Sequence, residues 1–210
     1  MSFADEIKLY LPRYLSEDST KELLKELEAF PTEGTKQTIY TTALKGENTL
    51  FQGDGVKNIC VINLPSSEIG KAPVMILSNT CDIALDNKRD YATPRICYAP
   101  ILNLEKYRVT LQKKKIAEVR INNHIEKIKR QQITSILYLP QGGNLQYEGI
   151  VFLDRLNNIS NEEIDRDDLQ NSRLFTLSNY GLYLFLLKIS IHFSRIQEKI
   201  DRNKGVIIQS

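Results

Sequence analysis

Hydrophobic positions along the chain change their spacing from helical to strand-like and back again. Near the N-terminus, Leu23 and Leu27 recur at helical spacing, and Pro31 follows them. Proline disfavours helical backbone in the residue before it, so a helix is expected to end there. We therefore predict a helical N-terminal segment over residues 1–32, followed by one larger domain over residues 37–210.

The middle of the chain contains short apolar runs separated by turns, a pattern typical of β-strands. Threonine, isoleucine and tyrosine are frequent in residues 38–44, and residues 73–77 form a continuous apolar run, as expected for a strand covered on both faces. The same criteria predict further strands over residues 56–64, 95–101, 135–139 and 149–153. Several short strands of this kind favour a mostly β fold with helices (α+β) that is built on a small barrel.

Helical spacing returns at the C-terminal end of the chain. Ser178 is a residue type that caps helices, and residues 182–200 are apolar on more than one face, which predicts a long and largely buried helix over residues 178–201. Its basic positions form one stripe and comprise Lys188, His192, Arg195 and Lys199. We expect this stripe to lie at a solvent-exposed edge, to pair with Asp154 and Glu162, or to contact a second subunit.

Charge is nearly balanced over the whole chain but not along it. The 28 Lys and Arg residues and the 26 Asp and Glu residues give a net charge of +2, which excludes a histone-like polycation. Residues 103–135 carry nine basic and three acidic side chains, a local charge of +6 that leaves −4 for the remainder. Ile121, Ile125 and Ile128 are spaced as one face of a helix there. We predict a basic insertion, either a nucleic-acid surface or a solvated face that balances acidic residues elsewhere.

Cysteine and histidine usage bears on location and on metals. Cys60, Cys81 and Cys97 are too few, and odd in number, for a disulfide framework, which favours a reducing cytoplasm. We expect no membrane association, because no apolar run approaches the roughly 18 residues of a membrane span. The two histidines are far apart in the sequence, and there is no Cys-x-x-Cys pair. We therefore expect no metal site and no cofactor.

Several short segments, taken in order, carry a family pattern. Gly53 and Asp54 open a predicted strand, and residues 72–79 read Ala-Pro-Val-Met-Ile-Leu-Ser-Asn. Residues 96–101 contain an Ala-Pro pair, and residues 149–159 combine a strand with a turn. Leu177-Ser178 then precedes the C-terminal helix. In this order the segments, roughly half of the chain, resemble the MazF/PemK toxins, which implies an SH3-like barrel with packed helices.

The resemblance also implies an activity, because these toxins cut single-stranded RNA without a metal. They use an arginine just before the strand proline and a threonine at the end of the next strand. Here these positions hold Ala72, with Lys71 beside it, and Leu102. Leucine moves no proton, and Lys71 lacks the bidentate fork of arginine. We expect a toxin-like, nucleic-acid-interacting protein of a bacterial toxin–antitoxin or phage-defence system, either an endoribonuclease or a non-catalytic barrel that binds a partner protein.

Candidate chemistry concentrates around the polar stretch Ser78-Asn79-Thr80-Cys81-Asp82. The candidates for an endoribonuclease site are Glu68 or Asp82 as the base and Lys71 and Arg89 as the cations. Cys81 is an alternative nucleophile, since a nearby cation would favour its thiolate. Two further interpretations stay open for this stretch. One is a phosphate contact that includes Asn87, and the other is a buried thiol beside a turn that Asp82 caps.

Nucleic-acid contacts are expected from the same stretch and from the basic insertion. Each phosphate that a cation neutralises adds salt-dependent affinity, and Tyr107 and Tyr138 are placed to stack on bases. The predicted contact residues are Asn79, Thr80, Arg95, Lys113, Lys114, Lys115, Arg120 and Lys127. The expected partners are therefore RNA or DNA, together with an antitoxin-like protein or a second copy of the chain.

Overall fold

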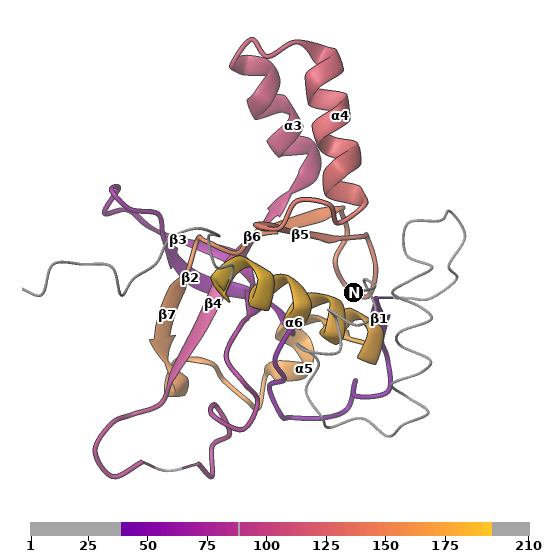
Figure 1. The fold of residues 1–210 in the computed structure, drawn as a ribbon. Coiled ribbons are helices and arrows are strands. Elements are labelled where there is room, and N and C mark those ends of the chain that lie inside the picture. Colours follow the sequence, from indigo (N-terminus) through magenta and orange to yellow (C-terminus); the bar gives the residue numbers. More distant parts are fainter. Residues whose placement is uncertain (1–38, 88, 195–210) are drawn as a thin grey trace, which may run out of the picture.

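The computed structural model describes residues 39–87 and 89–194 (Figure 1). The predicted helical segment 1–32 lies outside these residues, as does the end of the predicted C-terminal helix. Within the described part, the fold is α+β, with an antiparallel eight-stranded sheet and four α-helices. None of these helices combines the length and hydrophobicity that a membrane crossing requires.

The strands follow the order β1-β8-β2-β3-β4-β6-β5, and neighbouring strands are antiparallel. Their bounds are β1 Tyr40–Thr41, β2 Gly55–Ile62, β3 Ile69–Ile76, β4 Arg95–Asn103, β5 Ile136–Leu139, β6 Gly149–Phe152, β7 Asn157–Ser160 and β8 Arg173–Leu177. Strand β4 pairs with β7 along its first half and with β6 along its second half. Strands β6 and β7 therefore follow β4 like one strand that is interrupted by the turn at residues 153–156.

Several predicted strands have different bounds in the structure. Strand β1 covers two residues of the predicted range 38–44, and β3 begins four residues before the predicted apolar run. The sequence pattern did not predict β7 and β8. Polar residues, Asn157 and Arg173, hold buried positions in these strands, so the strands lack the apolar pattern by which the others were predicted.

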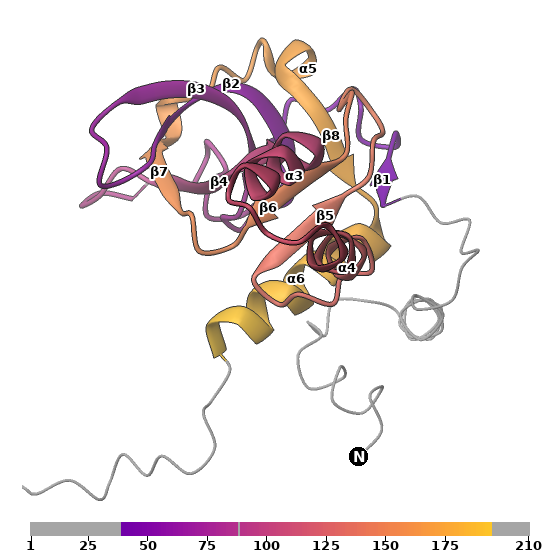
Figure 2. The same ribbon diagram turned by 90° about the horizontal axis from the view of Figure 1, so that it is seen from above.

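The predicted small barrel is not closed in the structure. The strand path ends at β1 and β5, and among the described residues these two strands share no ladder pairing. The sheet nevertheless curls strongly (Figure 2). Its two ends approach each other, because Tyr40 Oη in β1 donates to the carbonyl oxygen of Pro140, just after β5, at 2.7 Å.

Helix α6 (Asn179–Ser194) lies across the sheet and packs against it in one hydrophobic core (Figure 1). Leu184 and Phe185 are buried there in one cluster with Leu137 and Val151. The predicted cap is present, because Ser178 Oγ accepts a hydrogen bond from the Gly181 backbone N–H at 3.1 Å. The short helix α5 (Leu169–Ser172) and the 3-10 turn at Asn161–Glu163 lie on the segment between β7 and β8.

Helices α3 (Leu104–Lys113) and α4 (Glu118–Lys129) form a helical hairpin that projects from the sheet between β4 and β5 (Figure 1). The hairpin occupies most of the predicted insertion 103–135. As the spacing predicted, the three isoleucines lie on one helix, α4. They are buried and pack with Leu104 and Ile150 at the foot of the hairpin. The Asn103 side-chain oxygen caps α3 by accepting from the Lys106 backbone N–H at 2.9 Å.

The prediction of an exposed basic stripe on the last helix is wrong for Lys188, whose surface is only 4% exposed. Its Nζ donates to the backbone carbonyl oxygens of Ile133, at 2.7 Å, and of Ile136. Burial lowers the pKa of this amine from 10.5 to about 7. Lys188 therefore joins α6 to the segment that leads into β5.

Side chains cover the outer edge of β5. The Gln131 amide both donates to the Tyr138 carbonyl oxygen, at 2.7 Å, and accepts from the Tyr138 N–H, at 3.1 Å. The Ile136 N–H donates to the Ile133 carbonyl oxygen, and the Ile136 carbonyl oxygen accepts from Lys188. The backbone groups of Ile136 and Tyr138 are thus all bonded without a further strand.

Candidate nucleic-acid interface

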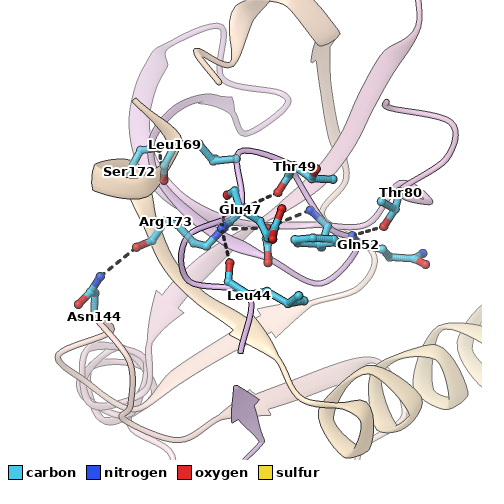
Figure 3. A network of polar contacts seen from close by, with 11 residues as sticks. Leu44, Glu47, Thr49, Gln52, Thr80, Asn144, Leu169, Ser172 and Arg173 are labelled. Carbon is cyan, nitrogen blue, oxygen red and sulfur yellow. Dashed lines mark hydrogen bonds and ion pairs between the residues drawn. The ribbon is translucent and has the colours of Figure 1, made fainter. Parts of the chain in front are cut away.

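The polar stretch after β3 is held in place by its own side chains. Ser78 Oγ accepts from the Cys97 N–H at 2.8 Å. Thr80 Oγ1 accepts from the Gln52 N–H at 2.9 Å, a contact seen in Figure 3. Both hydroxyls therefore bind backbone groups of neighbouring segments, as Ser and Thr commonly do in loops.

The rest of this stretch follows the same rule. Asn79 Oδ1 accepts from the Cys81 N–H at 2.9 Å, and Asn87 Nδ2 donates to the Cys81 carbonyl oxygen at 2.8 Å. Arg89 and Asp82 form an exposed ion pair at 2.6 Å. The Cys81 thiol is exposed and makes no hydrogen bond among the described residues. Its role as a nucleophile stays a prediction.

The four side chains predicted for an endoribonuclease site do not meet in one place. Glu68 and Lys71 lie where β3 begins, whereas Asp82 and Arg89 lie beyond its other end. The eight residues of β3 span about 25 Å. Arg95, at the start of β4, instead binds Asn158 of β7, through its side-chain oxygen at 2.5 Å and its carbonyl oxygen at 3.3 Å.

The two positions that the sequence comparison aligned with catalytic residues of the toxins, Ala72 and Leu102, lie on adjacent strands. Val74 of β3 pairs with Pro100 of β4. When this antiparallel register is continued by two residues, Ala72 comes opposite Leu102. Both positions hold aliphatic side chains, so neither can donate to a phosphate or transfer a proton there.

A cavity of about 380 Å³ opens beside Leu102, at the foot of α3. Its walls come from the end of β4, one face of α3, and the end of β6 with the turn that follows. We call it the hairpin groove, and it is lined by Leu102, Asn103, Lys106, Tyr107, Thr110, Leu111, Lys114, Phe152 and Arg155.

The hairpin groove has a positive lining. It contains the side chains of Lys106, Lys114 and Arg155 but no carboxylate from the described residues. Within residues 39–87 and 89–194, these three cationic groups form no hydrogen bond or ion pair, whereas Arg108 on the same helix is paired with Glu118 at 2.5 Å. The groove therefore presents positive charge that is available to an anion.

Aromatic rings form one wall of the hairpin groove. The Arg155 guanidinium lies 4.2 Å from the centre of the Phe152 ring, a cation–π arrangement. Tyr107 meets Phe152 edge-on, with ring centroids 5.6 Å apart. Tyr138, the other tyrosine predicted to stack on bases, instead donates to Glu148 at 2.5 Å.

Tyr107 also contacts a histidine of the second helix of the hairpin. Its Oη lies 3.1 Å from Nε2 of His124 on α4. Burial raises the pKa of Tyr107, with Arg155 acting in the opposite direction. Burial, with the nearby Lys127 charge, lowers the pKa of His124 below its usual 6.5, so the imidazole is neutral at pH 7.

The sequence predictions cover this surface in part. Lys114 lines the groove, and Lys113 and Lys115 are exposed beside it at the end of α3. Arg120 and Lys127 are exposed on α4. Asn79 and Thr80 lie in the loop after β3, on a different segment. The site residues that the sequence interpretation missed are Lys106, His124, Phe152 and Arg155.

A second cluster of polar groups is buried and closed (Figure 3). Arg173 and Asp54 are 6% and 0% exposed, and Arg173 Nε lies 3.1 Å from Asp54 Oδ2. The other guanidinium nitrogens donate to the carbonyl oxygens of Leu44, at 3.2 Å, of Glu47, at 2.9 Å, and of Thr49. This cluster, the Arg173 anchor, fixes the segment between β1 and β2 to β8.

Burial strongly affects the acid of the Arg173 anchor. It raises the pKa of Asp54 to about 6, while the Phe51 N–H and the Arg173 charge act in the opposite direction. The Phe51 N–H donates to Asp54 Oδ2 at 3.0 Å. Because these groups are enclosed, we regard the anchor as part of the fold and not as a binding surface.

Comparison with known proteins adds no relative. No protein-family model matches the chain, and no curated protein matches it significantly. In the described part of the chain, no group of three or more His, Cys, Asp or Glu side chains is arranged to hold a metal ion.

Proposed function

We propose that this chain is a toxin-like, nucleic-acid-interacting protein that binds single-stranded RNA in the hairpin groove. The observation that supports this most directly is the combination of three unpaired cations with the rings of Tyr107 and Phe152 in one cavity. Phosphates favour unpaired cations, and unstacked bases favour aromatic faces.

The toxin-family resemblance belongs to the same proposal. It includes an SH3-like fold for the curled sheet, an endoribonuclease activity, a cytoplasmic location and a setting in toxin–antitoxin or phage defence. The position of the groove supports it, because the groove is lined by Leu102, the residue that the resemblance aligns with the family threonine. The three free cysteines are consistent with a reducing compartment.

An RNA-binding titration tests the proposal. Fluorescence anisotropy of a labelled single-stranded RNA, in EDTA and over a range of salt concentrations, gives both affinity and its salt dependence. The triple variant K106A/K114A/R155A is expected to bind at least about tenfold more weakly. Its plot of log affinity against log salt should be flatter by about 2, since each phosphate contact with a single strand contributes about 0.7.

A matched control removes the same amount of charge elsewhere. The triple variant K71A/R89A/R95A loses three cations from the segments predicted by sequence and leaves the hairpin groove intact. It should keep the wild-type affinity and salt dependence. If this control loses binding and the groove variant keeps it, the RNA site lies at those segments and the groove proposal is wrong.

A second candidate function, binding of a partner protein, is favoured by a different surface. Leu64 and Ile69, on the hairpin between β2 and β3, are 77% and 73% exposed. Both side chains belong to one β-hairpin, and apolar surface that is exposed in this way often marks a protein contact. This function would be favoured if the wild-type protein did not bind RNA but bound a partner protein, and if the L64S/I69S variant no longer bound that partner.

A further inference from the structure

Tyr107 and His124 form a pair that RNA binding alone does not require. They come from different helices of the hairpin, and the Tyr107 Oη and His124 Nε2 atoms are 3.1 Å apart. Tyr107 lines the groove, whereas His124 lies behind it on α4. A tyrosine that lines the proposed RNA-binding groove, with its hydroxyl within hydrogen-bond distance of an imidazole, is an arrangement suited to proton transfer.

We propose that Tyr107 is a catalytic residue of the hairpin groove, positioned and assisted by His124, for cleavage of the RNA strand bound there. This inference rests on the proposed function, because it needs a strand in the groove. It assigns the chemistry to side chains other than Ala72 and Leu102, although Leu102 lines the same groove, and other than Glu68, Lys71, Asp82 and Arg89.

The step is a transesterification within the RNA. The ribose 2′-hydroxyl gives its proton to Tyr107 Oη while Tyr107 passes its own proton to His124 Nε2. The 2′-oxygen forms a bond to phosphorus, and the bond from phosphorus to the 5′-oxygen breaks. The leaving 5′-oxygen takes a proton from the ammonium group of Lys106 or Lys114. The imidazolium and the neutral lysine then exchange protons with solvent, so the net reaction consumes no proton.

Surrounding charges are suited to each part of this step. The Arg155 guanidinium acts electrostatically on the Tyr107 hydroxyl and is available to the charge that develops on the phosphate oxygens. His124 is faced by Tyr107 from α3 and by Lys127 from its own helix. The Lys127 charge and burial keep the imidazole neutral at pH 7, the state that accepts a proton.

Two conservative variants test the pair. Tyr107→Phe keeps the ring against Phe152 and removes only the hydroxyl, and His124→Gln keeps a polar group near the Nε2 position but cannot accept a proton. The substrate is a long single-stranded RNA in EDTA, which presents many sequence contexts. Both variants should cleave about 100-fold more slowly than the wild type, with RNA affinity unchanged within about threefold. Thermal melting of each variant verifies folding.

The pH profile separates proton transfer from a structural role. Wild-type cleavage should rise with pH through a value below 6.5 and then level off, because only neutral His124 accepts the proton. The residual activity of His124→Gln should lack this rise. The products should carry 2′,3′-cyclic phosphate and 5′-hydroxyl ends, and a 2′-deoxy strand should remain intact.

Measuring cleavage and binding separately distinguishes the proposal that the groove binds RNA from the proposal that Tyr107 catalyses its cleavage. Wild-type protein that binds RNA but leaves it intact, or variants that cleave at the wild-type rate, would overturn the assignment of Tyr107 and leave the binding proposal standing. RNA that does not bind in the titration would overturn both.

Discussion

Two arginines of this chain lie over phenylalanine rings, yet their surroundings are opposite. Arg173 lies 5.6 Å from the ring centre of Phe51, and Arg155 lies 4.2 Å from that of Phe152. Arg173 is buried, with an acid and three carbonyl oxygens around its guanidinium. Arg155 is exposed, and within the described part of the chain its guanidinium has no hydrogen-bonding partner.

The difference teaches which cations to associate with function. A guanidinium with all its nitrogens bonded inside the protein organises the chain, and an external phosphate would have to displace those bonds. A guanidinium that is held by a ring alone retains its donors for a ligand. The hydrogen-bond partners of each guanidinium therefore distinguish the structural arginine of the Arg173 anchor from the available arginine of the hairpin groove. Their charge is the same, and their sequence context does not reveal the difference.

The largest expected effect comes from removing the buried cation. Arg173→Met leaves Asp54 without its counter-ion and three carbonyl oxygens without donors, which should lower the free energy of unfolding by about 3–5 kcal/mol. Arg155→Met should lower it by no more than about 1 kcal/mol. Urea denaturation of both variants gives the two values. Equal losses would mean that the two arginines do not differ as described.

A third cation sharpens the comparison through pH. Lys188, like Arg173, donates to buried carbonyl oxygens, but its pKa is about 7 in the folded protein and near 10.5 when unfolded. Between these values the unfolded chain binds a proton that the folded chain does not. Stability should therefore rise with pH from about pH 7 to about pH 9, by at most about 1.4 kcal/mol per unit. Below pH 7 this contribution levels off.

Lys188→Met provides the control for that rise. Urea denaturation at several pH values between about pH 7 and pH 9 gives its free energy of unfolding. This free energy should not show the rise with pH that Lys188 causes in the wild type. A rise of the same size in the variant would show that other groups cause it. Measurements stay below pH 10, because burial raises the pKa of several tyrosines, including Tyr107 and Tyr147, and these side chains then titrate in the unfolded chain.

A smaller effect is expected at the cap of α3, which forms one wall of the groove. Asn103→Ala removes the acceptor for the Lys106 N–H and should cost about 1 kcal/mol. Asn103→Asp keeps an acceptor there but adds a carboxylate to the groove lining. We expect Asn103→Asp to retain stability in urea denaturation and to weaken RNA binding in the anisotropy titration. Unchanged RNA affinity would contradict the electrostatic role of the groove.

The smallest effect is predicted for a third arginine environment. Arg89 and Asp82 are paired but exposed, with 49% and 63% of their side-chain surface accessible. Such pairs contribute little, because water and salt screen them. Arg89→Ala should change the free energy of unfolding by less than about 0.5 kcal/mol. If Arg89→Ala lowered the free energy of unfolding as much as Arg173→Met, an arginine's ion-pair partner would contribute to stability whether or not the pair is buried.

Regular spacing explains which elements the sequence could predict. Ile121, Ile125 and Ile128 were correctly assigned to one helix, and Ser178 to a helix start. Strand β8 was missed because buried Arg173 gives it a polar character that only its distant carbonyl partners explain. Burial of Lys188 was missed for the same reason, since its acceptors lie more than 50 residues away.

The candidate groove was predictable only in part. The basic composition of residues 103–135 drew attention to Lys114, but Arg155 lies in a turn far along the chain. It reaches the groove because β6 and β7 follow the same edge of β4 and leave that turn beside α3. Sequence spacing carries no sign of this, because the neighbours belong to separate strands.

The covered edge of β5 has a consequence for how the protein behaves in a crowded solution. Open strand edges are templates on which other chains add strands, and such growth leads to domain swapping and fibrils. Gln131 adopts a left-handed backbone conformation, with φ of 57°, which glycine would adopt with less strain. A glycine there would lack the side-chain amide that bonds the backbone N–H and carbonyl oxygen of Tyr138. The chain thus keeps a locally unfavourable residue whose side chain occupies backbone groups of β5 with which an added strand would pair.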